Sequence, residues 1–161
     1  MRKTVLVLFA LMLGTVAFAQ INDHALGLRL GGSNSVSNEI SYQHGLSNKN
    51  RFEADLGLRN HKYYSAFSLS GVYQWVWGIE SGFSWYAGVG GQLGSWSWKD
   101  KYSGDDDSGT WLAVLGQIGI EYQFTEIPIQ ISIDTRPSIG LVNYNSELGY
   151  WDLALGIRYT F

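Results

Sequence analysis

The sequence predicts an all-β protein, an eight-stranded antiparallel up-and-down β-barrel that spans a membrane. Apolar residues recur at every second position in eight segments. Every charge within these segments falls on the face opposite the apolar one, and that opposite face is rich in Gly and Ser. A soluble core of Gly and Ser would contain voids, whereas a narrow lumen needs small residues beside long charged ones. We therefore expect the apolar face to contact lipid and the polar face to line the interior.

Residues 1–19 have the features of a cleaved signal peptide. Arg2 and Lys3 precede an apolar run, and Ala17-Phe18-Ala19 is a small-x-small cleavage site. The run is too short, and too close to that site, to favour a retained membrane helix. Removal of 19 of the 161 residues and two positive charges leaves one domain, residues 20–161, with 142 residues and a formal charge of −5 in place of −3.

Composition excludes several classes of protein. The 11 Lys and Arg residues are scattered and form no basic stripe, so we expect no nucleic-acid partner. The chain has no cysteine, and therefore no disulfide and no thiolate metal site. Seven Trp, 20 Gly and only 2 Pro suit a barrel with aromatic girdles.

The first three predicted strands are short to medium in length. Residues 25–31 alternate Leu with small residues and Arg29. Residues 39–43 place Ile and Tyr on one face, and residues 52–59 place Phe, Ala and two Leu opposite Glu, Asp, Gly and Arg. Each segment is bounded by polar or glycine-containing stretches, which indicate turns.

The next three predicted strands are longer. Residues 66–75 and 83–94 alternate aromatic or aliphatic residues with Ser, Gln and Gly, and residues 112–124 alternate Leu, Val and Ile with Ala, Gln, Gly and Glu. A tilted strand needs about 9 to 11 residues to cross a bilayer. The wider regions 63–77 and 82–96 exceed that length.

The last two predicted strands carry the clearest alternation. Residues 129–139 place four Ile on one face, and residues 151–161 place Trp, Leu, Ile, Tyr and Phe on one face with Asp and Arg on the other. The total of eight is even, as bacterial single-chain barrels require.

The connections predict the orientation in the membrane. With the mature N-terminus in the periplasm, the short connections 45–50, 78–81 and 125–128 are periplasmic turns. The outer connections are then 33–36, 60–62, 95–109 and 142–149, of which 95–109 is the longest.

Aromatic residues are expected to form a belt at each membrane interface, where amphipathic rings are favoured. The periplasmic belt is predicted to contain Tyr42, Phe52, Trp75, Trp77, Phe83, Trp85, Tyr122, Phe124, Tyr159 and Phe161. The outer belt is predicted to contain Tyr63, Tyr64, Trp96, Trp98, Trp111, Tyr144 and Trp151.

The final segment resembles the C-terminal signal of bacterial outer-membrane barrels, in which alternating apolar residues end on an aromatic. Ile157, Tyr159 and Phe161 occupy those positions. The resemblance implies recognition by the barrel-insertion machinery and a location in the outer membrane of a Gram-negative bacterium, in contact with its lipid.

The mature chain also resembles small OmpX-like and OmpA-barrel-like proteins, including an uncharacterised group with a Gly-Ile-Glu-Tyr strand, a proline-containing turn and an Asp-x-Arg-Pro strand. Here these are residues 119–124, Pro128 and residues 134–137. The motifs imply no activity. The first two outer loops are shorter than in OmpX-like proteins, and the peptidoglycan-binding domain of OmpA-like proteins is absent, so no cell-wall tether is implied.

The polar face carries the main group of candidate functional residues. Buried charges persist when they are paired and hydrogen-bonded, so we expect an ion-pair network that fills the lumen. A narrow ion path is the alternative interpretation. The predicted network consists of Arg29, Glu39, Glu53, Asp55, Arg59, Glu121, Asp134, Arg136, Asp152 and Arg158.

Catalysis is not expected, although lipid-A acyltransferases and deacylases are also eight-stranded barrels. His24 and His44 lie near predicted periplasmic ends and His61 lies in an outer loop, and none has an evident Ser and carboxylate beside it. We interpret all three as solvated interface residues. No cofactor or metal is predicted.

The longest outer connection is the candidate interaction surface. It contains Trp96 and Trp98, followed by Asp105, Asp106 and Asp107. The spacing of a calcium-binding loop is absent, so the carboxylates are interpreted as a solvated tip. The two Trp residues serve either adhesion or the aromatic belt. The expected function is therefore a structural or surface-interaction barrel, and the alternatives are a narrow channel, a lipid-A-modifying enzyme and a soluble ligand-binding barrel.

Overall fold

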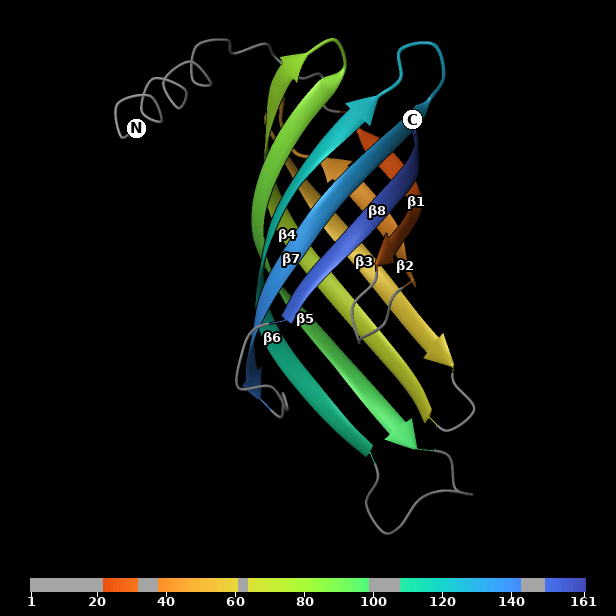
Figure 1. The fold of residues 1–161 in the computed structure, drawn as a ribbon, viewed down its shortest axis with the longest axis vertical. Coiled ribbons are helices and arrows are strands. Elements are labelled where there is room, and N and C mark those ends of the chain that lie inside the picture. Colours follow the sequence, from red (N-terminus) through yellow and green to blue (C-terminus); the bar gives the residue numbers. More distant parts are fainter. Residues whose placement is uncertain (1–21, 32–37, 61–63, 99–107, 143–149) are drawn as a thin grey trace, which may run out of the picture.

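Eight antiparallel strands close into a barrel in the computed structural model, which describes residues 22–31, 38–60, 64–98, 108–142 and 150–161 (Figure 1). The predicted all-β class and the predicted number of strands are confirmed. The strands are β1 (His24–Gly31), β2 (Asn38–Gly45), β3 (Asn50–Asn60), β4 (Tyr64–Glu80), β5 (Phe83–Trp98), β6 (Ser108–Gln123), β7 (Ile129–Val142) and β8 (Tyr150–Thr160).

Each strand pairs with its neighbours in the chain, and a ladder between β1 and β8 closes the barrel. Because neighbouring strands face each other in register, such as Leu28 opposite Ile40 on one side and Ile157 on the other, side chains of the same kind form rows around the wall. Closure pairs both edges of the sheet, as a strand-built membrane span requires.

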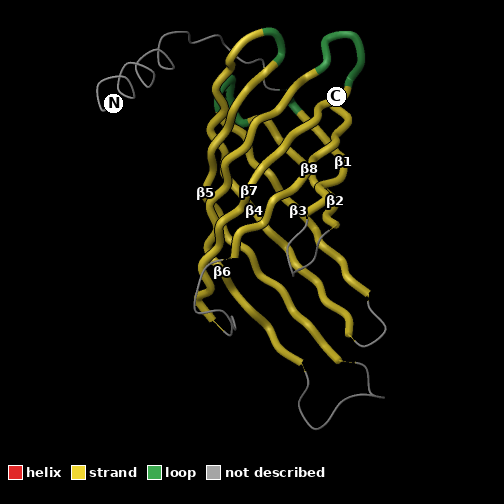
Figure 2. The backbone as a smooth tube through the Cα atoms, viewed as in Figure 1, coloured by secondary structure: helices red, strands yellow, loops and turns green. Residues whose placement is uncertain are grey.

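The two ends of the barrel differ. One end carries the short connections between β2 and β3, β4 and β5, and β6 and β7, together with the start of β1 and the end of β8 (Figures 1 and 2). We call this the turn end, and the opposite one the loop end. The wall is also uneven, since β4, β5 and β6 have 17, 16 and 16 residues whereas β1 and β2 have 8. In Figure 1 the longer strands project beyond the others at the loop end.

A two-residue turn joins β4 to β5 at the turn end. Ser81 and Gly82 both have positive φ angles, 51° and 88°, which is the pattern of a type I′ hairpin turn. The sequence placed this connection at 78–81, but β4 continues to Glu80 through a register shift after Gly78. The prediction was wrong because two residues suffice to reverse the chain when the second is glycine.

The barrel is apolar outside and polar inside. Large apolar side chains from all eight strands are exposed, whereas the buried residues are mostly Ser, Gln, Asp, Glu and Arg. This confirms the predicted direction of the two faces. Among the described residues, no helix is long and apolar enough to span a membrane.

The loop end of the β5–β6 hairpin departs from this arrangement. The predicted connection 95–109 is strand at both ends, because Ser95 pairs with Thr110 and Ser97 with Ser108. All four residues lie on the outward face. Closer to the turn end, the same face carries apolar residues such as Leu93 and Leu112. The outward face therefore becomes polar where the hairpin extends beyond the apolar band.

Candidate functional site

Glu53 lies at the centre of the interior, with none of its surface exposed. It comes from β3, where its neighbours Phe52 and Ala54 are on the outward face. Its carboxylate accepts hydrogen bonds from Arg158 of β8 at 3.2 Å and from Gln117 of β6 at 3.2 Å, and also from Arg136 of β7 and Gln43 of β2. One side chain thus connects five strands across the lumen.

A second layer lies closer to the loop end and is built around Arg29 of β1. Its guanidinium pairs with Asp134 at 2.7 Å, Asp152 at 2.7 Å and Glu39 at 3.1 Å. Arg136 joins this layer to the Glu53 layer, because it also pairs with Glu39, at 3.2 Å. The charges are therefore continuous along the lumen rather than isolated pairs.

Arg136 and Arg158 are held by further polar groups. Arg136 pairs with Asp55 at 2.6 Å, and Arg158 donates to the hydroxyls of Ser41 at 3.0 Å and Ser132 at 2.9 Å. A buried charge costs several kcal/mol unless pairing and hydrogen bonds compensate for lost hydration. Small hydroxyl side chains thus complete the hydrogen bonding of Arg158, whereas the buried Nε atom of Arg136 has no hydrogen-bond partner among the described residues.

Arg51 closes the lumen at the turn end. Its guanidinium forms two parallel hydrogen bonds with Glu121, at 2.9 and 2.6 Å, and lies 4.8 Å from the centre of the Tyr86 ring. Bidentate pairing of Arg with a carboxylate fixes both groups in one geometry. The pair forms the floor of a cavity that opens at the turn end.

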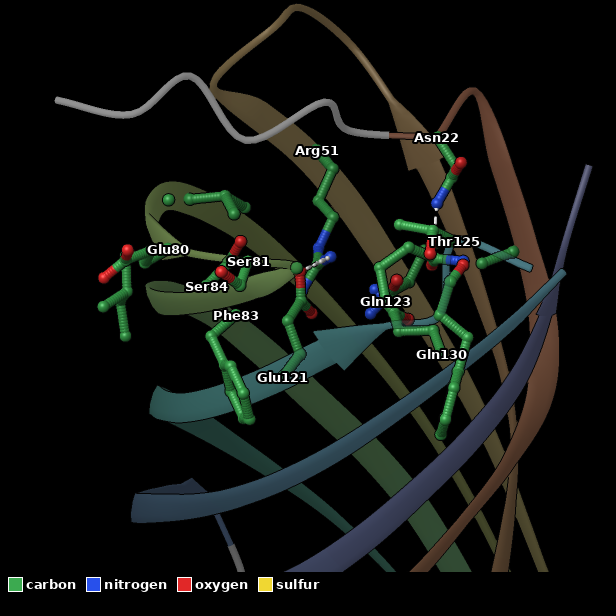
Figure 3. Close-up of a pocket in the computed structure, with 17 residues that line it drawn as sticks. Asn22, Arg51, Glu80, Ser81, Phe83, Ser84, Glu121, Gln123, Thr125 and Gln130 are labelled. Atoms are coloured by element: carbon green, nitrogen blue, oxygen red, sulfur yellow. Dashed lines mark hydrogen bonds and ion pairs between the residues drawn. The ribbon is translucent and has the colours of Figure 1, made fainter. Parts of the chain in front are cut away.

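This cavity, which we call the vestibule, has a volume of about 450 Å³ (Figure 3). Glu80 contributes from the end of β4 and Ser81 from the β4–β5 turn, and Asn22 lies at the edge of the cavity, where its side-chain amide donates to Gln123 at 2.9 Å. Gln130 also lines it, and its buried Oε1 atom has no hydrogen-bond partner among the described residues. The vestibule thus has a mixed polar and apolar lining and ends at the Arg51–Glu121 pair.

Nine of the ten predicted lumen residues have described side chains, and the structure brings all nine into this one interior network. The side chain of Arg59 lies outside the described part of the chain. Arg51 was missed, because the third segment was taken to begin at Phe52. The signal was its place on the inward face, two positions before Glu53.

The predicted outer belt of aromatic residues is partly wrong. Trp96 and Trp111 lie on the inward face of β5 and β6, where Trp96 covers Gly109 and Trp111 covers Gly94. The strands leave the apolar band at this level, so Ser and Thr face outward and the rings turn toward the barrel axis. Trp151 is exposed on the outward face of β8, as predicted.

Some residues of the predicted interaction surface and outer belt lie outside the described part of the chain. They are Asp105, Asp106 and Asp107 of the surface, Tyr63 and Tyr144 of the belt, and the side chains of Tyr64 and Trp98.

The turn end carries a belt of aromatic rings. Trp77 stacks on Trp85 with 4.2 Å between ring centres, and Tyr122 contacts both Phe83 and Phe124. Ile157, Tyr159 and Phe161, which the resemblance assigned to the insertion signal, are exposed on the outward face of β8 or at its end. Their place agrees with the predicted pattern, and their recognition by insertion machinery stays a prediction.

Comparison with known proteins agrees with the architecture. No family model matches the sequence, and no curated protein sequence matches it. The N-terminal β-barrel domain of Pseudomonas aeruginosa OprF is similar in structure, with a TM-score of 0.64 and 16% identity over 87% of this chain and 98% of that chain. Neisserial surface protein A is similar with a TM-score of 0.60 and 20% identity, over 86% of this chain and 94% of that chain. At these identities the likeness concerns the fold, and the chain has the fold of small eight-stranded outer-membrane β-barrels.

Proposed function

We propose that this protein resides in the outer membrane of a Gram-negative bacterium as a closed scaffold that presents its loop end at the cell surface. The observation that carries the proposal is the Glu53-centred network, which joins five strands across the lumen through buried side chains. Eight strands enclose an interior just wide enough for side chains to fill it. A filled interior favours a structural or surface-interaction role over transport.

The outward face supports the membrane location. Ile133 and Leu155, which lie opposite each other on β7 and β8, are each more than half exposed. Exposed apolar rows on every strand cost free energy in water and are stable in lipid. At the loop end of β5 and β6 the outward residues change from apolar to Ser and Thr, which fits a wall that leaves the lipid at this level.

A narrow channel is the second candidate, and the vestibule favours it. The cavity leads from the turn end into the barrel as far as Arg51 and Glu121. An ion path would require that pair to separate and the Glu53 layer behind it to rearrange. Because Glu53 has four side-chain partners, we favour the closed scaffold.

Planar-bilayer recording tests the choice. The mature chain, refolded and inserted into the bilayer, is expected to show no steady openings. The double variant Arg51→Ala/Glu121→Ala removes the vestibule floor without leaving an unpaired charge, and is expected to stay closed because the Glu53 layer remains. If the unmodified protein shows steady openings, and the double variant changes their conductance, the protein is a channel and the closed-scaffold proposal is wrong.

We assign the interaction surface to residues 99–107, which include Asp105, Asp106 and Asp107, and to the adjoining Trp98. Replacement of 99–107 by a Gly-Ser linker of equal length is expected to leave the heat-modifiable gel mobility of the barrel unchanged. Binding of cells to host or bacterial surfaces, measured with and without the linker, tests the role. Unchanged binding would move the interaction surface elsewhere.

A further inference from the structure

Two histidines face each other on the outward side of β1 and β2 at the turn end. His24 pairs in register with His44. The backbone N–H of Gly45 donates to the carbonyl of Asp23 at 2.9 Å, so residues 23 and 45 form a hydrogen-bonded pair. Because hydrogen-bonded and non-hydrogen-bonded pairs alternate along an antiparallel ladder, His24 and His44 form a non-hydrogen-bonded pair, with Cα atoms about 4.5 Å apart. This is the position at which cross-strand side chains approach most closely.

The two rings already lie at the spacing of metal ligands. Their Nδ1 atoms are 3.4 Å apart and their ring centres 5.0 Å apart. Two nitrogen ligands, each at about 2.0–2.1 Å from the ion, are about 3.3–3.4 Å apart on a tetrahedral ion such as Zn²⁺, and about 2.8–3.0 Å apart when adjacent on a square-planar ion such as Cu²⁺. The rings are within 23° of parallel, so a rotation about Cβ–Cγ is needed to direct both nitrogens at one ion. His44 is exposed, so there is room for that rotation at His44, whereas His24 is half-buried.

Packing limits the freedom of His24. Its ring stacks on Phe161 with 5.4 Å between centres, and its Nδ1 atom lies 2.8 Å from the hydroxyl of Tyr42. A ligand that is already ordered loses less conformational entropy on binding. The Phe161 ring thus orders one ligand, and the Tyr42 hydroxyl has to release its hydrogen bond with Nδ1 when that atom binds an ion.

The donor set determines the kind of ion. Imidazole nitrogen suits Zn²⁺, Cu²⁺ and Ni²⁺, whereas Ca²⁺ and Mg²⁺ prefer oxygen ligands. Within the described residues, no group of three or more His, Cys, Asp and Glu side chains is placed to hold a metal. Water would complete the coordination of an ion held by this pair.

We propose that His24 and His44 form a two-histidine site for a divalent transition-metal ion, which clips β1 to β2 at the turn end. The site lies beside the β1–β8 ladder, since His24 exchanges backbone hydrogen bonds with Phe161 at 3.1 and 2.9 Å. An ion bound by the folded barrel alone therefore stabilises it and reinforces the region where the wall closes.

The test is a titration of the refolded, tag-free barrel in detergent with Cu²⁺. We expect one ion per chain and an electron paramagnetic resonance spectrum with two imidazole nitrogens. His24→Gln and His44→Gln are each expected to lower the affinity at least about tenfold, because the remaining ligand loses the chelate effect. His61→Gln, which changes the third histidine of the chain, is the matched control and keeps the affinity of the unmodified barrel.

Heat-modifiable gel mobility shows whether each variant is folded. If a variant fails to fold, the spectrum of the unmodified protein decides, since a signal from fewer than two imidazole nitrogens overturns the proposal. Affinity unchanged by both His24→Gln and His44→Gln, or lost in folded His61→Gln, overturns it as well. Ca²⁺ is expected not to compete with Cu²⁺, and competition by Ca²⁺ would contradict an imidazole site.

Discussion

Glu53 illustrates how a single residue sets the interior. It receives hydrogen bonds from two guanidiniums and two amides while none of its own surface is exposed. Removing its charge leaves Arg158 and Arg136 short of a partner in a place that bulk water does not reach. The interior is thus expected to be sensitive to the loss of this one charge.

Glu53→Gln is expected to lower the free energy of unfolding by about 3–5 kcal/mol, the usual cost of leaving a buried charge unpaired. Glu80→Gln is the control, because Glu80 is exposed at the turn end and its change should cost less than about 0.5 kcal/mol. Urea unfolding of both variants in lipid vesicles, followed by Trp fluorescence, measures the difference. Equal effects would show that the Glu53 network contributes little.

At the scale of the strand, glycine positions decide how closely β4 and β5 approach. A Cβ atom added at Gly90, on the inward face, would lie 2.0 Å from the carbonyl oxygen of Gly71 and 2.8 Å from Cα of Val72. Neither atom can move without shifting the backbone of β4. At Gly91, on the outward face, the nearest atom would be the carbonyl oxygen of Ala113 at 3.8 Å.

Gly90→Ala is therefore expected to destabilise the barrel by about 1–3 kcal/mol, as overpacking does, whereas Gly91→Ala is expected to be neutral or slightly stabilising. The two substitutions add the same methyl group one residue apart. Unfolding transitions recorded in parallel provide the comparison, and a larger loss in Gly91→Ala would contradict the described packing of β4 on β5.

The sequence predicts well which residues form the strands and which face each residue is on, but it predicts poorly the side-chain contacts across the lumen. Alternation assigned the inward face correctly because the side-chain period of a strand is two. Arg29 and Asp134, however, are 105 residues apart in the chain, and pairing across the lumen depends on the closed curvature of the wall. Alternation therefore predicted a charged interior but not which charges pair with each other.

The remaining errors arose where a strand begins or changes environment. Arg51 precedes the first apolar residue of β3, so alternation did not include it. Trp96 and Trp111 lie where the outward face becomes polar. From that level to the loop end, the rule that large rings lie on the outward face no longer holds. The alternating Ser95, Ser97, Ser108 and Thr110 contained the signal of the change.

At the scale of the whole molecule, the unequal strand lengths would determine how the barrel is positioned in a bilayer. Strand β5 has 16 residues and is about 53 Å long at about 3.3 Å per residue. The apolar band of such barrels is about 25 Å tall. Even with a strand tilt of about 40°, the loop-end parts of β5 and β6 would extend beyond such a band into water.

The lipid-facing band is tested with two exposed apolar residues. Ile133→Arg, near the middle of β7, is expected to cost about 2–4 kcal/mol because it places a charge in hydrocarbon. Leu46→Arg, in the β2–β3 turn, is expected to cost little. Ile133 is 56% exposed and Leu46 is 52% exposed, so a water-soluble barrel would tolerate both changes. The free energy of unfolding and the fraction of protein inserted in vesicles, measured for both variants, distinguish a membrane-spanning barrel from a water-soluble one.

The ladder between β1 and β8 has a consequence for the order of assembly. Every other ladder joins strands that follow each other in the chain and forms as a hairpin. Closing β1 onto β8 joins Leu26 to Tyr159, and the entropic cost of bringing such distant residues together is the largest in the fold. Until closure, both strands would expose unpaired backbone groups to hydrocarbon. Membrane insertion and barrel closure are therefore expected to occur in one step, and β1 is expected to pair with β8 only after β8 has formed.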